Sequence, residues 1–363
     1  MTPHTVEGLQ RFVHEALPMR VRFGAGSVSE LPEEIDLLGL ERVVVLCSPE
    51  QTDTAEMVAG ILGDRCVGIL PHARMHVPRD AATDTRESVE RGDAQGCVAV
   101  GGGSAVGLGK AIALTTDLPV VALPTTYAGS EMTPIWGLTE NGVKRTGRDR
   151  RVLPRAVVYD PELTISLPAA LSVVSGINAV AHAVEGLYAP DSTPILDLMA
   201  AEGTRALLAS LPRLVENGTD LSARAEALSG AWLCGAVLGA TTMSLHHKIC
   251  HVLGGMLDLP HAPTHTVVLP HVLAYNAPAG SRAVDAVAGA LGGSARPPGD
   301  LWTFIGDLGG PRSLRELGMN EGDVAAVAEA TVQQSYANPR TVTTSEVGEL
   351  LHRAWSGAPP AAI

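Results

Sequence analysis

Short apolar runs alternate with longer amphipathic stretches over the first 160 residues of the chain. The runs are rich in Val, Ala and Leu, and they lie at residues 43–47, 66–70, 97–100, 119–124 and 156–159. Helix-like segments stand between them at residues 50–62, 80–91 and 107–115. Continuously apolar strands that alternate with helices are typical of a parallel sheet covered on both faces. We therefore predict a Rossmann-like α/β domain over residues 1–160.

After Asp160 the pattern changes to long stretches that are rich in Ala and Leu and have helical periodicity. These stretches cover residues 171–187, 195–214, 224–238, 242–257, 282–291, 300–308, 323–334 and 344–355. The sequence thus predicts an all-helical second domain over residues 161–363.

The composition narrows the class of protein. Apolar residues make up 45% of the 363 residues, which is enough for substantial cores. The formal net charge of −13 disfavours nucleic acid and anionic membranes as partners. Five scattered cysteines without a CxxC pair indicate a reducing cytoplasm. We expect no signal peptide, and no apolar run that reaches the roughly 18 residues of a membrane span.

A glycine-rich turn follows the apolar run at residues 97–100. Gly101, Gly102 and Gly103 precede Ser104 and a helix-like segment. Glycine lets backbone N–H groups approach an anion closely, and the start of a helix favours negative charge. A tight strand-to-helix turn would also need glycine, but three in succession before Ser favour binding of a dinucleotide pyrophosphate.

A second polar loop follows the run at residues 119–124. It contains Thr125, Thr126 and Tyr127. The carboxyl ends of parallel strands face the ligand crevice of such sheets. We therefore expect Thr125 and Thr126 at the cofactor and Tyr127 at the substrate.

Histidines gather in the second half of the chain. Residues 244–265 hold five of the 12 histidines, namely His246, His247, His251, His261 and His265. Asn178 and His182 form a further polar pair at helical spacing. Residues i and i+4 share one face of a helix, and imidazole suits both metal binding and proton transfer. The cluster therefore predicts a site, whereas His72 and His76 carry no motif and are expected on the surface.

Together these segments resemble the group III, or iron-containing, alcohol dehydrogenase family, and within it the maleylacetate reductase branch. The resemblance rests on residues 101–104, 124–134, 178–182, 230–234, 246–254, 259–261 and 264–271, in order along nearly the whole chain. It implies a dehydroquinate synthase-like fold and a cytoplasmic homodimer. It also implies NADH- or NADPH-dependent reduction of the small dicarboxylate maleylacetate to 3-oxoadipate, in the degradation of aromatic compounds. The alternative is a metal-dependent alcohol dehydrogenase of the same family.

The resemblance also bears on metal and cofactor. In metal-dependent relatives an Asp and three His bind Fe²⁺ or Zn²⁺, and these positions map onto Asn178, His182, His247 and His261. A neutral amide at 178 is a poorer ligand for a divalent ion than a carboxylate, so we expect no bound metal. Many relatives place an Asp, which would repel a 2′-phosphate, where Ser48 stands here, so NADH and NADPH both stay open.

If the substrate is maleylacetate, hydride addition β to its ketone leaves an enolate, whose charge a cationic hydrogen-bond donor can hold. We expect His247 and His251 to be this donor and acid, and His182 and His261 to complete the catalytic wall. The expected substrate contacts are Asn178, Tyr127, Lys248 and His265. Two other classes stay open: a dehydroquinate synthase-like cyclisation and elimination, which Asn178 disfavours, and a non-catalytic nucleotide-binding protein, which the histidine cluster disfavours.

Overall fold

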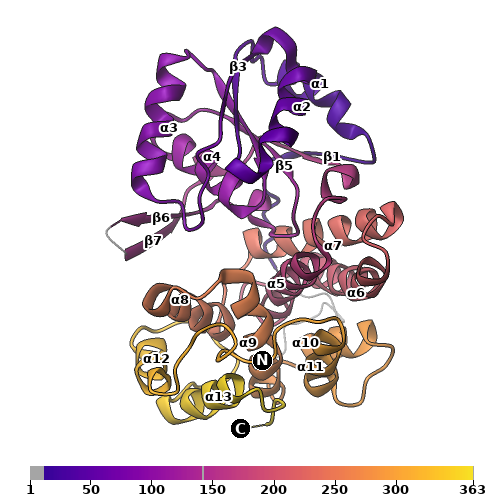
Figure 1. Cartoon of the computed structure of the whole chain (residues 1–363). Helices are drawn as coiled ribbons and strands as arrows, with labels where there is room; N and C mark the ends of the chain where they lie inside the picture. Colours follow the sequence, from indigo (N-terminus) through magenta and orange to yellow (C-terminus); the bar gives the residue numbers. More distant parts are fainter. Residues whose placement is uncertain (1–11, 141–142, 363) are drawn as a thin grey trace.

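The structure is a computed structural model that describes residues 12–140 and 143–362. An α/β part lies on a helical part (Figure 1), and the chain passes from one to the other after strand β8 (Ala156–Tyr159). The fold class predicted from the sequence is confirmed. The proposed domain boundary near Asp160 stays a prediction.

A parallel sheet of six strands, in the order β1-β8-β5-β4-β2-β3, forms the centre of the α/β part. Its other strands are β1 (Arg20–Phe23), β2 (Val43–Leu46), β3 (Cys66–Leu70), β4 (Gly96–Gly101) and β5 (Val120–Pro124). Strands β2, β4, β5 and β8 are buried along their whole length, which explains their unbroken apolar sequences. The sequence pattern missed β1, because this edge strand alternates Arg with apolar residues.

Helices cover both faces of the sheet. On one face α1 (Leu31–Leu37) and α2 (Thr52–Leu62) form a core with Val43 and Val45. On the other face α3 (Arg79–Arg91) and α4 (Gly103–Thr116) pack against Val44 and Leu46. The alternating side chains of β2 therefore enter two separate cores. A two-stranded hairpin, β6 (Ile135–Glu140) and β7 (Val143–Arg148), stands apart from the sheet (Figure 1).

The helical part is built around α5 (Ala169–Leu187). The remaining helices are α6 (Pro194–Glu216), α7 (Leu221–Ala240), α8 (Leu245–Leu257), α9 (His261–Asn276), α10 (Ser281–Ala290), α11 (Pro297–Asp307), α12 (Asp323–Val332) and α13 (Thr344–Ser356). Helix α5 is long enough, and apolar enough on average, to cross a membrane, although polar residues interrupt its sequence. However, 89% of it is buried inside the protein, as in a core helix.

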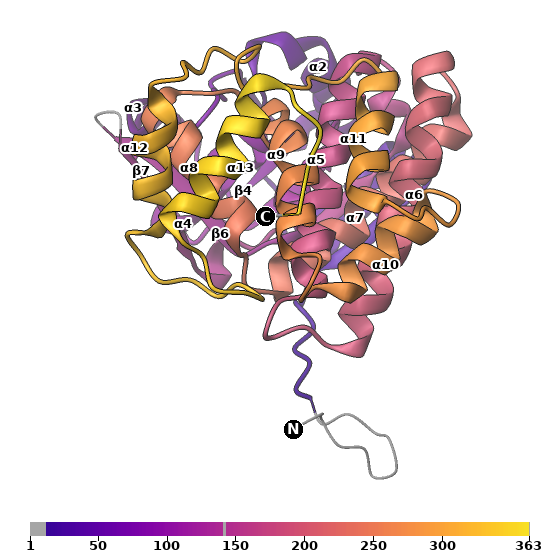
Figure 2. The same ribbon diagram turned by 90° about the horizontal axis from the view of Figure 1, so that it is seen from below.

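Helix α9 was not predicted, because Pro263 and Pro270 interrupt its sequence. Pro263 lies in the first turn, where the missing N–H costs no intrahelical hydrogen bond. The helix lies at the centre of the helical part, in contact with α5, α8, α11 and α13 (Figure 2). This position brings His261 and His265 close to the histidines of α8.

Candidate active site

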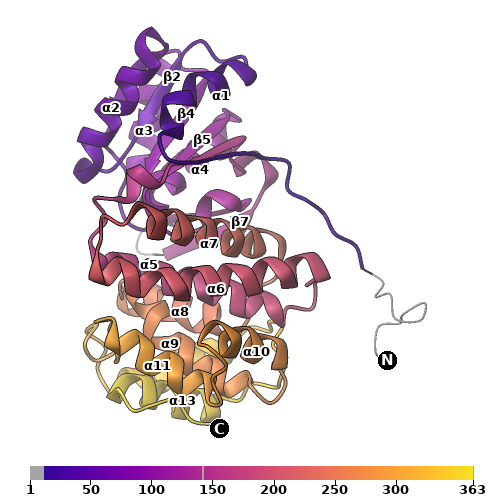
Figure 3. The same cartoon turned by 90° about the vertical axis from the view of Figure 1, so that its right-hand side faces the viewer.

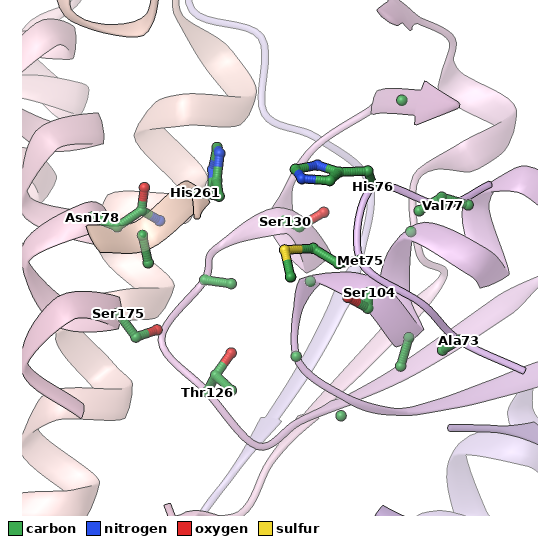
Figure 4. Close-up of a pocket in the computed structure, with 18 of the residues that line it drawn as sticks. Ala73, Met75, His76, Val77, Ser104, Thr126, Ser130, Ser175, Asn178 and His261 are labelled. Atoms are coloured by element: carbon green, nitrogen blue, oxygen red, sulfur yellow. The ribbon is translucent and has the colours of Figure 1, made fainter. Parts of the chain in front are cut away.

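A cleft of about 1130 Å³ lies between the carboxyl edge of the sheet and helices α5, α8 and α9. Figure 4 shows residues from both parts facing it, among them Ser104, Thr126, Asn178 and His261. Strand β3 lies on one side of β2, whereas the next strands, β4, β5 and β8, follow one another on the other side. The cleft opens at this reversal of strand order, between β2 and β4. Ligands of open α/β sheets bind at this topological switch point.

The glycine turn forms one end of the cleft as expected for an anion cradle. Gly101 has φ of 139°, and Gly102 caps α4 without a side-chain hydrogen bond to the first turn. The unpaired N–H groups of that turn carry the positive end of the helix dipole. The structure places Gly101, Gly102, Gly103, Ser104, Thr125, Thr126 and Ser48 along the cleft wall.

Tyr127 does not line the cleft, in contrast to the expected substrate contact. Its side chain is fully buried, and its hydroxyl accepts a hydrogen bond from Arg224 Nη1 at 3.0 Å. Its backbone N–H donates to Ser175 Oγ at 3.0 Å. Thr125 and Thr126, in contrast, line the cleft.

Five of the predicted polar residues form the opposite wall: Asn178 and His182 of α5, His247 and His251 of α8, and His261 of α9. The ring centroids of His182 and His247 are 5.2 Å apart, and those of His247 and His251 are 6.0 Å apart. Burial, together with the nearby His247 and His261, holds the pKa of His182 well below its usual value. His182 is therefore neutral, and proton donation falls to its neighbours.

Glu185 orients His247. Its buried carboxylate accepts hydrogen bonds from the backbone N–H of Ser244 at 2.9 Å and of His246 at 2.7 Å. It also accepts one from Nδ1 of His247 at 2.7 Å. The carboxylate thus caps α8, whose own N-cap side chain makes no capping bond. Nδ1 carries the proton in this pair, and Nε2 of His247 is left for the cleft.

A second layer of histidines lies behind this wall. His246 Nε2 and His265 Nδ1 are hydrogen-bonded at 2.9 Å, and both side chains are fully buried. Burial, followed by the neighbouring histidines, lowers the pKa of each ring well below its usual value. Neither His265 nor Lys248 lines the cleft. Lys248 Nζ instead donates a hydrogen bond to Oε1 of Gln334 at 3.3 Å. The structure thus places Lys248 and His265, two expected substrate contacts, away from the lining of the cleft.

Comparison with known proteins adds the family. Residues 18–161 match the iron-containing alcohol dehydrogenase model, and residues 172–355 match the C-terminal model of the same family. The chain belongs to the iron-containing alcohol dehydrogenase family. It is 53% identical to the maleylacetate reductase of Burkholderia cepacia, over 97% of this chain and 100% of that protein. The predicted membership of the maleylacetate reductase branch is confirmed, and the protein is an oxidoreductase that acts on a small molecule.

Solved structures agree with this assignment. The crystal structure of maleylacetate reductase from Agrobacterium tumefaciens has a TM-score of 0.93 and 48% identity, and covers 97% of this chain and 100% of that chain. The enzyme from Rhizobium sp. strain MTP-10005 has a TM-score of 0.92 and 48% identity, with the same coverage. The dehydroquinate synthase-like and non-catalytic alternatives are not supported.

The metal position that the family implies is a poor fit to these residues. Asn178 Oδ1 and His182 Nδ1 are buried without a hydrogen-bond partner, but the set has no carboxylate to neutralise a divalent ion. Within the described residues, the three side chains whose ligand atoms lie within 4.8 Å of one another are His246, Cys250 and His265. His182, His247 and His261 do not converge in this way. These residues therefore do not form a suitable site for a divalent metal ion.

Two residues that shape the site, Glu185 and His76, were not among the predicted site residues. Glu185 follows His182 by three residues on α5, so their shared helix face was a usable signal. Its partner on α8 could not be identified without the packing of the two helices. His76, expected on the surface, lines the cleft instead.

Proposed function

We propose that the protein is an NADH- or NADPH-dependent maleylacetate reductase that forms 3-oxoadipate in the breakdown of aromatic compounds. The observation that carries the proposal is one cleft with a dinucleotide cradle on one side and a wall of His247, His251 and His261 around the amide of Asn178 on the other. Relatives about half identical to the chain support it. Residues 1–160 would bind the cofactor, and residues 161–363 would carry the catalytic side chains.

The reaction requires hydride and a proton. A bound NADH or NADPH, held at Gly101, Gly102, Gly103 and Ser104, would supply the hydride that the alkene carbon β to the ketone of maleylacetate takes up. The π electrons of the C=C bond move toward the ketone oxygen and leave an enolate. As an imidazolium, with its Nδ1–H bound to Glu185, His247 donates a hydrogen bond from Nε2 to this oxygen. His251 supplies the proton that the carbon α to the ketone takes up. NADH becomes NAD⁺, and 3-oxoadipate is the product. The neutral His182 contributes to the wall as a polar contact.

We expect the substrate to be held by hydrogen bonds from histidine and from the Asn178 amide. The chain has a net charge of −13, so a dianion needs local donors to enter the cleft. His251 and His261 are exposed on its wall. The assay that tests the proposal is oxidation of NADH or NADPH that depends on added maleylacetate.

We further propose a cytoplasmic homodimer. Strand β1 lies at the edge of the sheet, and edge strands invite pairing with another chain. From β1 residues 12–19 run out as an extended segment (Figure 3), in which Phe12 is 47% exposed and Val13 91% exposed. An oligomer of one chain is consistent with exposed apolar residues in such a segment.

Chelation is expected to leave activity intact. Because Asn178 replaces a carboxylate in the position of a metal ligand, removal of divalent ions with EDTA should reduce turnover of maleylacetate less than twofold. In parallel, Asn178→Asp is expected to raise Zn²⁺ affinity, measured by calorimetry. Loss of turnover on chelation that Fe²⁺ or Zn²⁺ restores would contradict this, and would favour the metal-dependent alcohol dehydrogenase reaction.

Glu185→Gln is expected to lower kcat about 10–100-fold, the range typical of groups that orient a catalytic or ligating histidine. Glutamine has a single acceptor oxygen, so it can replace Oε2, which accepts from Ser244 and from Nδ1 of His247, or Oε1, which accepts from the N–H of His246, but not both. Glutamine is also uncharged, so it cannot stabilise the imidazolium of His247 that donates from Nε2. Steady-state kinetics give kcat, and fluorescence titration should show NADH affinity nearly unchanged.

A matched control is Glu131→Gln. This buried carboxylate accepts from the Tyr159 hydroxyl at 2.7 Å and does not line the cleft. A Glu185→Gln protein with the melting temperature of Glu131→Gln and full kcat would remove Glu185 from the catalytic arrangement.

A further inference from the structure

The loop between β3 and α3 has an unusual backbone next to the cleft. His76 and Val77 are consecutive non-glycine residues with positive φ, at 62° and 46°. A positive φ is uncommon for any side chain and an outlier for a β-branched one. Such conformations persist where the surrounding structure fixes them, and they cluster at functional sites.

Strand β6 and helix α4 fix this loop. Thr139 of β6 donates from its backbone N–H to Val77 O at 3.1 Å, and from Oγ1 to His76 O at 2.8 Å. The buried Val77 side chain packs against α4 at Gly107, where a Cβ would lie 2.7 Å from Val77 Cγ2. A side chain at 107 would displace the loop, so α4 and β6 together hold its backbone in place.

The consequence is that the ring of His76 points into the cleft, opposite His261 (Figure 4). Its side chain is 22% exposed, and Nε2 lies 3.6 Å from Oδ1 of Asp258. Asp258 ends α8, three residues before His261, and it also has a positive φ of 52°. His76 thus reaches from the α/β part to the end of the cleft that holds the catalytic histidines.

We propose that His76 binds one of the two carboxylates of the substrate. This inference rests on the proposed function, because maleylacetate carries a carboxylate at each end. From the α/β side, three side chains that can be cationic line the cleft: Arg74, His76 and Lys110.

The ammonium group of Lys110 already makes three hydrogen bonds within the protein. Its Nζ donates to Ser130 O at 2.6 Å, Thr133 Oγ1 at 2.9 Å and Ile135 O at 2.8 Å. His76 faces His261 across the cleft (Figure 4). The substrate would then lie between donors from both walls of the cleft.

The test compares His76→Asn with Asp258→Asn. Asparagine tolerates positive φ well, so both variants keep the backbone at these positions, and thermal melting checks the fold. KM and kcat are measured for maleylacetate and for two monoacids, 4-oxopent-2-enoate and 3-oxohex-4-enoate, each of which lacks a different carboxylate. In His76→Asn we expect KM for maleylacetate to rise roughly 10–100-fold, the worth of a hydrogen bond to a charged group. We expect kcat and the Kd of NADH to change less than threefold.

The monoacids identify the contact. The KM effect of His76→Asn should persist with one monoacid and vanish with the other, while Asp258→Asn changes KM less than about threefold with all three substrates. An equal rise in KM in both variants with every substrate would show that the contact of His76 with Asp258 only holds the two parts of the protein together. This result would overturn the proposal. An unchanged KM, or a weakened Kd of NADH, would overturn it as well. A wild-type enzyme that does not reduce maleylacetate would instead overturn the proposed function, and the inference with it.

Discussion

Replacing His247 by alanine is expected to lower kcat for maleylacetate about 10²–10³-fold, the usual cost of losing one donor to a developing oxyanion. His247 is held by a buried carboxylate, with Nδ1 2.7 Å from Oε2 of Glu185. Its loss removes the donor and leaves the buried carboxylate without its imidazole partner. Because the ring is not part of the glycine cradle, NADH affinity should change little. His251→Ala is expected to lower kcat in the same range.

Lys248→Ala is the matched control on the same helix. Lys248 Nζ points to Gln334 and away from the cleft, so kcat should stay within about twofold of the wild-type value. Stopped-flow kinetics under single turnover separate hydride transfer from product release. A His247→Ala protein that is folded and keeps near-full hydride transfer would exclude His247 as the donor.

Gly102→Val is expected to weaken NADH binding at least about 100-fold, because two charge-assisted hydrogen bonds to the pyrophosphate are worth roughly 1.5–3 kcal/mol each. A Cβ at Gly102 would lie 2.9 Å from Thr126 Oγ1 and 3.0 Å from its Cγ2. The valine must therefore displace Thr126 or move the start of α4, and either shift disturbs the cradle. Calorimetric titration with NADH and NADPH measures the loss.

The control for this substitution is Gly289→Val on the exposed face of α10, where a Cβ meets no atom within 4 Å. This variant should bind NADH as the wild type does. If folded Gly102→Val also binds NADH with unchanged affinity, the cofactor pyrophosphate does not lie at the glycine turn.

Much of the fold could be predicted because burial on both faces leaves a plain signal in the sequence. Strands β2, β4 and β5 are apolar along their whole length, and the start of α4 is marked by Gly101, Gly102 and Gly103. Strand β1 and helix α9 had no comparable signal. The edge strand carries two arginines, and the helix carries two prolines.

The site was harder to predict, because helical spacing shows which residues share a face but not which face meets the ligand. His261 and His265 are paired as the spacing predicts, with ring centroids 4.3 Å apart, yet only His261 lines the cleft. His265 turns toward His246 on the neighbouring helix. Likewise, nothing in the sequence around His76 indicates a positive φ, because no glycine stands there. The contacts of Thr139 and Gly107 that hold this loop come from distant segments.

The most direct test of the account follows the hydride. The protein is incubated with maleylacetate and with NADH deuterated at the transferable position of nicotinamide C4, and the product is analysed by NMR and mass spectrometry. We expect 3-oxoadipate with one deuterium on the carbon β to the ketone, formed in step with NADH oxidation. Deuterium on the former carbonyl carbon of a hydroxy acid, or no reaction with maleylacetate from an enzyme that oxidises simple alcohols, would contradict it.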